Sequence, residues 1–162
     1  MVTERPANLK SASKSILSIL VGIAIDEGFL QGVYFGGNDM QLRPRDMVTI
    51  GRLLLRSGAL SGTRVVSANW IQDSLTPRSR SERSGREYGY GWWMREFSGV
   101  RFYYAWGYGG QFIFIAPRLD TVVVMTSSPH PGDGRRAHLR ALYDMVEHNI
   151  VPALLAGSVT HE

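Results

Sequence analysis

Apolar residues run almost without interruption from Ile16 to Ile25, directly after a short segment of serines and a lysine. The polar start and the following Gly28 predict a helix over residues 11–27 that begins near Ser11. Apolar positions cover nearly the whole circumference of this helix. Such a helix belongs in the middle of a fold rather than on its surface.

Three later segments also have the pattern of helices. Residues 45–57 place apolar side chains at helical spacing and are followed by Gly58. Ser67 is a suitable N-cap for a short helix over 68–75. A last helix is predicted over 134–155, with arginines on one side and apolar residues on the other.

The segment between these helices has the texture of strands. The stretches YGYGWWMRE, VRFYYAWG, GQFIFIAP and DTVVVMTS are short, aromatic or β-branched, and separated by turn residues. Together the elements predict an α+β fold, an antiparallel β-sheet flanked by N-terminal and C-terminal helices. The length of 162 residues suits a single domain, and we expect one over residues 1–162.

Charge adds one feature to this picture. The net charge is +4, and all basic residues except Lys10 and Lys14 are arginine. The stretch TPRSRSERSGRE contains four arginines: Arg78, Arg80, Arg83 and Arg86. We interpret this stretch as a flexible, solvated loop. A basic surface that binds acidic partners is the alternative. No aromatic residues interleave with these charges, so we expect no nucleic acid partner.

The apolar run is shorter than the roughly 18 residues of a helical membrane span, so we expect no span. A secretory signal is the other interpretation, because the two lysines precede an apolar stretch of suitable length. The run ends in Asp26 and Glu27 without a small-residue cleavage site, which favours a cytoplasmic chain. The chain has no cysteine, so disulfides and thiolate chemistry are excluded.

Ser11 and Lys14 are three residues apart, a spacing that places both side chains on one face of a helix. A serine hydroxyl needs a base to act as a nucleophile, and a lysine can serve when burial disfavours its charged form. We expect the neighbouring apolar helix to provide that burial. The helix N-terminus also favours a developing oxyanion. The alternative is structural: a serine that caps the helix and a solvated lysine.

Several stretches together resemble the serine β-lactamase-like superfamily: SASKSILSILVGIAIDEG, GGNDMQLRPRDMVTIGRLLLRSGAL, VVSANWIQDS, YGYGWW and WGYGGQFIFIAPRLDTVVVMTSS. That superfamily includes class C β-lactamases, penicillin-binding peptidases, family VIII esterases and 6-aminohexanoate-dimer hydrolases, the last of which look most similar. The resemblance implies a bacterial serine hydrolase that cleaves a small amide or ester through an acyl-enzyme. It implies no cofactor and no metal.

By that resemblance, Ser11 is the acylated serine and Lys14 the lysine of the Ser-x-x-Lys motif. The third motif of the superfamily, on a strand beside the serine, corresponds to Tyr108, Gly109 and Gly110, and the backbone N–H near Gln111 would complete the oxyanion hole with that of Ser11. A tyrosine replaces the usual lysine or histidine there, which puts recognition of a substrate carboxylate in doubt. A bulged strand start explains the same glycines structurally.

The chain departs from the superfamily at the second motif. Tyr-x-Asn occurs nowhere, and Ser67-Ala68-Asn69 matches Ser-x-Asn only at a predicted helix cap. Residues 29–32 run almost directly into GVYFGGNDM, so the long middle segment is absent. We expect a shortened relative, in which Tyr34, Tyr104 or Tyr108 could replace the missing tyrosine. The rival interpretation is an inactive remnant that binds a partner or self-associates through exposed apolar surface on the helix over 15–25.

Overall fold

The computed structural model describes residues 7–26, 41–128, 130 and 132–158. A six-stranded antiparallel sheet forms its centre, in the order β10-β9-β8-β7-β6-β5. Its strands are β5 (Ser79–Arg80), β6 (Glu87–Tyr88), β7 (Trp93–Phe97), β8 (Val100–Gly107), β9 (Gln111–Ala116) and β10 (Thr121–Met125). The predicted α+β class, with a flanked antiparallel sheet, is confirmed.

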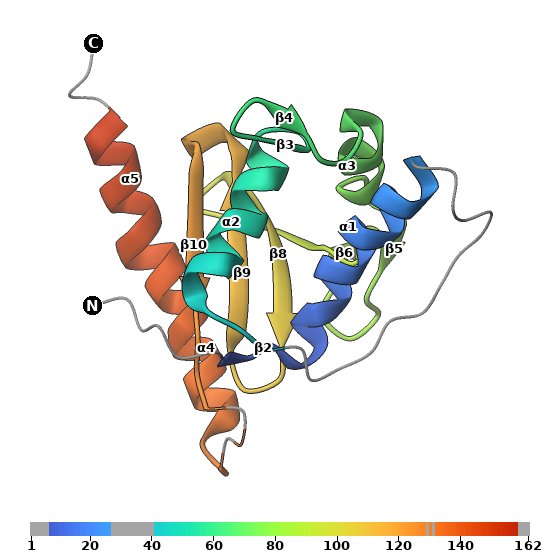
Figure 1. Cartoon of the computed structure of the whole chain (residues 1–162). Helices are drawn as coiled ribbons and strands as arrows, with labels where there is room; N and C mark the ends of the chain where they lie inside the picture. Colours follow the sequence, from blue (N-terminus) through green and yellow to red (C-terminus); the bar gives the residue numbers. More distant parts are fainter. Residues whose placement is uncertain (1–6, 27–40, 129, 131, 159–162) are drawn as a thin grey trace.

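Helices cover both faces of the sheet (Figure 1). One face carries η1 (Lys10–Ala12), α1 (Ser13–Asp26), α2 (Pro44–Leu55) and α3 (Ala68–Ser74). The other face carries the C-terminal helix, which comprises α4 (Arg135–Met145), the π-helical turn η3 (Val146–Ile150) and α5 (Val151–Ser158). Strands β1 (Ala7–Asn8) and β2 (Gln41–Leu42) form a small two-stranded antiparallel sheet, and β3 (Ala59–Leu60) and β4 (Thr63–Arg64) form a hairpin. The turn η2 (Pro117–Leu119) completes the described elements.

Strand β9 is the core of the fold because all six of its residues are buried. Ile113 and Ile115 pack with the cluster formed by α1, α2 and α3. Phe112 and Phe114 point the other way, into the cluster formed with the C-terminal helix. Alternate residues of a strand face opposite sides of a sheet, so a strand covered on both faces is apolar throughout.

The predicted helix boundaries are close to the observed ones, and their signals act as expected. Ser67 accepts a hydrogen bond from the N–H of Trp70, 3.2 Å away, and thereby caps α3. Gly58, at φ +91°, donates its N–H to the carbonyl of Leu53 and ends the turn after α2. Within the C-terminal helix, Pro152 lies just after the π-helical turn. A proline ring does not fit inside an unbroken α-helix, so the helix departs from α-helical geometry just before it.

Two predictions need correction. Helix α1 does not lie in the middle of the fold: Ile16 and Ile19 are buried, but Leu20 is 50% exposed. The helix packs along one side of the molecule, against β8 and α3, so only part of its circumference is covered (Figure 1). The arginine-rich stretch is also not wholly a loop, because Arg80 pairs with Glu87 across β5 and β6 and extends the sheet.

Other predictions fall outside the described residues. The helix stop at Gly28, the connection over 29–40 and the candidate Tyr34 belong to this group. Among the described residues, no helix is both long enough and apolar enough to cross a bilayer.

Truncating Phe114 tests whether β9 is the centre of the core. Its ring is fully buried and lies 4.7 Å from that of Phe112 and 5.4 Å from that of Tyr104, centroid to centroid. We expect Phe114→Ala to lower the free energy of unfolding by about 3–5 kcal/mol, because it removes buried area and leaves a cavity. The control Leu20→Ala, at a half-exposed side chain, should change it by less than about 0.5 kcal/mol in the same urea titration.

Candidate active site

Ser11 and Lys14 lie together at the junction of η1 and α1. The Lys14 Nζ donates a hydrogen bond to the Ser11 Oγ over 3.2 Å, and both side chains are exposed to solvent. The neighbouring Ser13 and Ser15 are instead buried. Of these three serines, Ser11 is therefore the one whose side chain is exposed to solvent.

The exposure of Lys14 departs from the sequence-based expectation. The apolar helix was expected to bury this amine, but the side chain lies on the outer face of the first turn of α1. Ile16 and Ile19, which follow it, pack into the core cluster, and α1 contacts β8 and α3. The described residues therefore supply a hydrogen-bonded hydroxyl and amine, without a desolvating cover.

The backbone before the serine is held in an unusual conformation. Lys10 has φ +49°, a left-handed value that costs a non-glycine residue energy. The Ser13 hydroxyl donates to the Lys10 carbonyl over 2.8 Å, and Leu9, directly before it, is fully buried. These contacts fix the start of the helix, and with it the position of Ser11.

Two glycines let other segments approach this helix start. A Cβ on Gly107, at the end of β8, would lie 1.9 Å from the Leu9 carbonyl oxygen, so only glycine fits there. Gly91, before β7, lies against the backbone of α1 at Lys14 and accepts a hydrogen bond from the Ser15 hydroxyl. Gly107 thus brings the end of β8 against the backbone two residues before Ser11.

Four residues were expected to form the strand side of the site. Tyr108, Gly109 and Gly110 form the turn from β8 to β9, and Gln111 begins β9. Gly109 and Gly110 both have positive φ, and the N–H of Gly110 donates to the carbonyl of Gly107 over 3.2 Å. This arrangement makes the turn tight and glycine-dependent. The structure places the turn at the same end of β8 as the contact with Leu9.

The side chains of this turn have structural partners of their own. Gln111 is fully buried, and its amide bonds to the backbone N–H and carbonyl of Ser127. Tyr108 is 49% exposed, and the guanidinium carbon of Arg135 lies 4.7 Å from its ring centroid. Any role of Gln111 at the site is therefore restricted to its backbone, whereas the Tyr108 ring is accessible.

Tyr104 does not replace the tyrosine of the missing motif. It is fully buried on the face that packs against the C-terminal helix, whereas Leu9 and Ala12 belong to the cluster on the other face. Burial raises the pKa of Tyr104 well above its ordinary value, and the nearby Tyr143 adds to the shift. The phenol of Tyr104 therefore lies on the other face of the sheet from Ser11, and its raised pKa favours the protonated form.

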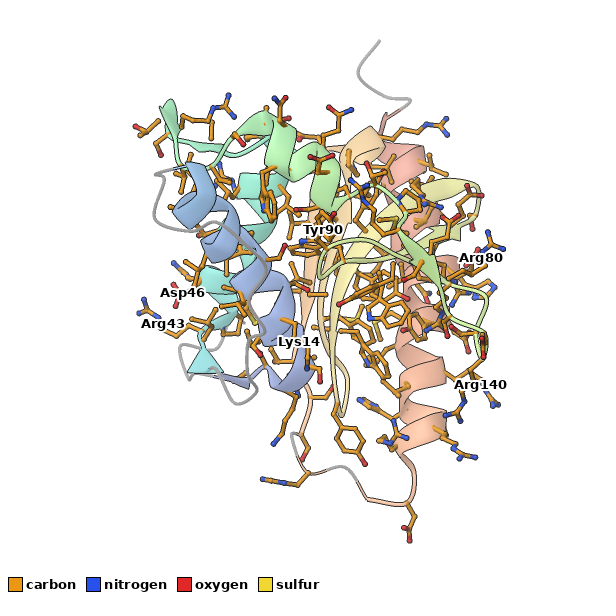
Figure 2. The ribbon with its side chains drawn as sticks, turned by 90° about the vertical axis from the view of Figure 1, so that its right-hand side faces the viewer. Lys14, Arg43, Asp46, Arg80, Tyr90 and Arg140 are labelled. Atoms are coloured by element: carbon orange, nitrogen blue, oxygen red, sulfur yellow. The ribbon has the colours of Figure 1, made fainter. Side chains whose placement is uncertain are left out.

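Sequence reasoning missed a tyrosine on the correct side of the molecule. Tyr90 precedes Gly91, is 43% exposed and stacks on Trp70 with ring centroids 5.7 Å apart. Trp70 in turn donates its indole N–H to the carbonyl of Ser18, one turn of α1 beyond Lys14. Figure 2 shows Tyr90 and Lys14 along the same side of the structure. The available signal was the pair of glycines in YGYGWW.

Among the described residues, no group of three or more histidine, aspartate or glutamate side chains could hold a metal ion. His138 instead lies 2.8 Å from the hydroxyl of Ser127, measured from its Nε2. The tryptophans near this part of the sheet lie in two environments. Trp92 is fully buried, whereas Trp93 and Trp106 are partly exposed on the face of the C-terminal helix.

Comparisons with known proteins add a relationship to this geometry. No family model matches the chain. Over 121 residues, 66% of the chain, it is 29% identical to a 6-aminohexanoate-dimer hydrolase from Paenarthrobacter ureafaciens, of which it covers 29%. Its fold matches 31% of a solved Bacillus anthracis structure, provisionally named a 6-aminohexanoate-dimer hydrolase, with a TM-score of 0.55, 20% identity and 72% of this chain covered.

The chain thus spans less than a third of the length of either relative. The solved structure supports the fold, and the curated relative supports a relationship in sequence. Both relatives carry the name of a hydrolase of the superfamily that these motifs resemble. The sequence match and the shared fold together show that this chain is related to the serine β-lactamase-like superfamily.

Proposed function

We propose that this chain carries the nucleophile and the base of a serine hydrolase that cleaves an amide or ester through an acyl-enzyme on Ser11. The observation that carries the proposal is the 3.2 Å hydrogen bond between the Ser11 hydroxyl and the Lys14 amine. A hydroxyl paired with an amine is the minimal arrangement for an activated serine. The named relatives are consistent with hydrolysis of an amide.

The reaction follows from these two groups. The Ser11 Oγ attacks the substrate carbonyl carbon, and the Lys14 Nζ, in its neutral amine form, takes the hydroxyl proton. The tetrahedral oxyanion forms near the N–H of Ser11 and the strand end at Gly107 to Gln111, where backbone donors stabilise it. The intermediate collapses, the leaving amine or alcohol accepts the proton, and water then hydrolyses the acyl-serine by the same steps.

Two features favour a second candidate, an inactive remnant that binds a partner or a second copy. The side chain of Lys14 is exposed to solvent, whereas the sequence predicted a buried amine. Leu20 exposes half of its surface on a helix that is apolar nearly all round. Exposed apolar surface of this kind is typical of contacts between proteins. Labelling of the serine separates the two candidates.

Ser11→Ala should abolish labelling by a serine-directed fluorophosphonate and hydrolysis of p-nitrophenyl butyrate, because the alanine cannot form a covalent adduct. The control Ser79→Ala removes an exposed hydroxyl from β5, far along the chain from the site, and should leave both readouts unchanged. Equal labelling of the Ser11→Ala variant, or no labelling of the unmodified protein, would favour the inactive remnant.

Lys14→Arg tests the amine as a base. Arginine keeps the positive charge and most of the length, but it does not lose its proton in proteins. We expect the rate of acylation to fall by about 10²–10⁴, the usual contribution of general base catalysis, measured by stopped-flow release of p-nitrophenol. Lys10→Arg changes the only other lysine of the chain and should keep most of the rate. An unchanged rate in Lys14→Arg would exclude the amine as the base.

Gly107→Ala tests the approach of the helix start to the strand. The new Cβ would meet the Leu9 carbonyl oxygen, a backbone atom, so η1 must move and carry Ser11 with it. A displacement of about 1 Å at a reacting group can cost about 10²-fold in rate. The control Gly132→Ala has open space around its Cβ and should be neutral. Full activity with a stable Gly107→Ala fold would show that this contact does not position the nucleophile.

A further inference from the structure

A groove of about 620 Å³ lies on the sheet face opposite Ser11. The loop between β5 and β6, strands β7 and β8, and helix α4 line it. Trp106, in its wall, packs with the C-terminal helix, whereas the adjacent Ala105 packs with Leu9 and Ala12 on the other face. In Figure 2, Arg140 on α4 and Lys14 accordingly lie on different sides of the molecule.

The groove is strongly cationic. One carboxylate, Asp144, lines it, and so do six guanidinium groups: Arg83, Arg86, Arg95, Arg135, Arg136 and Arg140. Among the residues that the structure describes, a single ion pair reaches these arginines, between Arg95 and Glu147 at 3.8 Å. Clustered like charges repel one another, so an anion bound in the groove would offset this repulsion and stabilise the folded protein.

Part of this charge is already held in place. The Arg86 guanidinium lies 4.5 Å from the Tyr143 ring centroid and donates to its hydroxyl over 3.0 Å. Arg95 lies over the rings of Phe97 and Tyr143, at 4.5 and 5.2 Å. Groups fixed before a ligand arrives lose little freedom on binding, which favours affinity. Arg83, Arg136 and Arg140 are exposed at the rim, where they can reach an anion.

The groove also has an aromatic wall. Trp93 and Trp106 both line it and pack edge to face, with ring centroids 6.5 Å apart. Aromatic and guanidinium surfaces provide platforms for planar rings, and arginine forks bind phosphate oxygens in pairs. The volume falls within the range of pockets that bind small organic ligands.

We propose that this groove binds a small organic polyanion that combines several phosphate groups with a planar ring, the chemistry of a nucleoside polyphosphate. The phosphates contact Arg83, Arg136 and Arg140, and the ring packs against the two tryptophans. This binding uses no contact with Ser11 or Lys14, which lie on the opposite face. It assigns a role to Arg83 and Arg86 of the arginine-rich stretch, which the hydrolase chemistry does not use.

Isothermal titration calorimetry at low salt and without divalent metal tests the proposal. The ligand is ATP, and tripolyphosphate and adenosine test its phosphate part and its ring part separately. We expect ATP to bind, tripolyphosphate to bind more weakly, and adenosine not to bind. The double variant Arg136→Gln/Arg140→Gln should weaken ATP binding at least about tenfold, because it removes two charged contacts. The control pair Arg52→Gln/Arg118→Gln makes the same charge change at exposed positions outside the groove and should change affinity less than about twofold.

Ser11→Ala should bind ATP as the unmodified protein does, which separates this site from the proposed hydrolase. Thermal melting of each variant verifies its fold, and ATP should raise the melting temperature of the groove variant less than that of the control pair. Equal weakening in both double variants would indicate general charge attraction and overturn the proposal. So would absence of ATP binding at millimolar concentration, adenosine that binds as well as ATP, or an oligonucleotide that binds where ATP does not.

Discussion

The close approach of the Leu9 carbonyl to Gly107 is the contact on which the arrangement of the candidate site depends. No side chain fits between these two backbones, so the end of β8 and the start of the helix are held directly against each other. The left-handed Lys10 turns the chain immediately afterwards, and Ser11 emerges into solvent with Lys14 beside it. A local backbone constraint thus fixes a hydroxyl, an amine and a glycine-rich turn relative to one another.

The sheet divides the molecule into two faces of different chemistry. The face under η1, α1 and α2 is largely aliphatic and carries the serine and the lysine at its edge. The face under the C-terminal helix is aromatic, and arginines surround its outer end. Because alternate residues of β8 and β9 point to opposite faces, a single pair of strands supports both clusters. The effect of a substitution on one face can therefore be compared with that of a similar substitution on the other face.

The sequence predicted the fold well where the signals are local. Strand and turn patterns located β7 to β10, and Ser67 and Gly58 marked helix ends that the structure reproduces. Burial around a helix is a tertiary property, so the apolar pattern of α1 could not reveal that Leu20 and Lys14 face solvent. The Ser-x-x-Lys spacing predicted that Ser11 and Lys14 share one face of the helix. The contribution of Gly107 and Gly91 to the position of that helix depends on contacts between segments far apart in the sequence, which the sequence alone does not reveal. The position of Tyr90 beside α1 depends on the same long-range packing.

The most direct test of the account is a crystal structure of the protein after reaction with a fluorophosphonate, because the adduct mimics the tetrahedral intermediate. The account predicts a covalent bond from phosphorus to the Ser11 Oγ, with the phosphonyl oxygen directed at backbone N–H groups of Ser11 and of the β8–β9 turn. Phosphorus attached to another side chain, or a phosphonyl oxygen directed into solvent away from that turn, would contradict it.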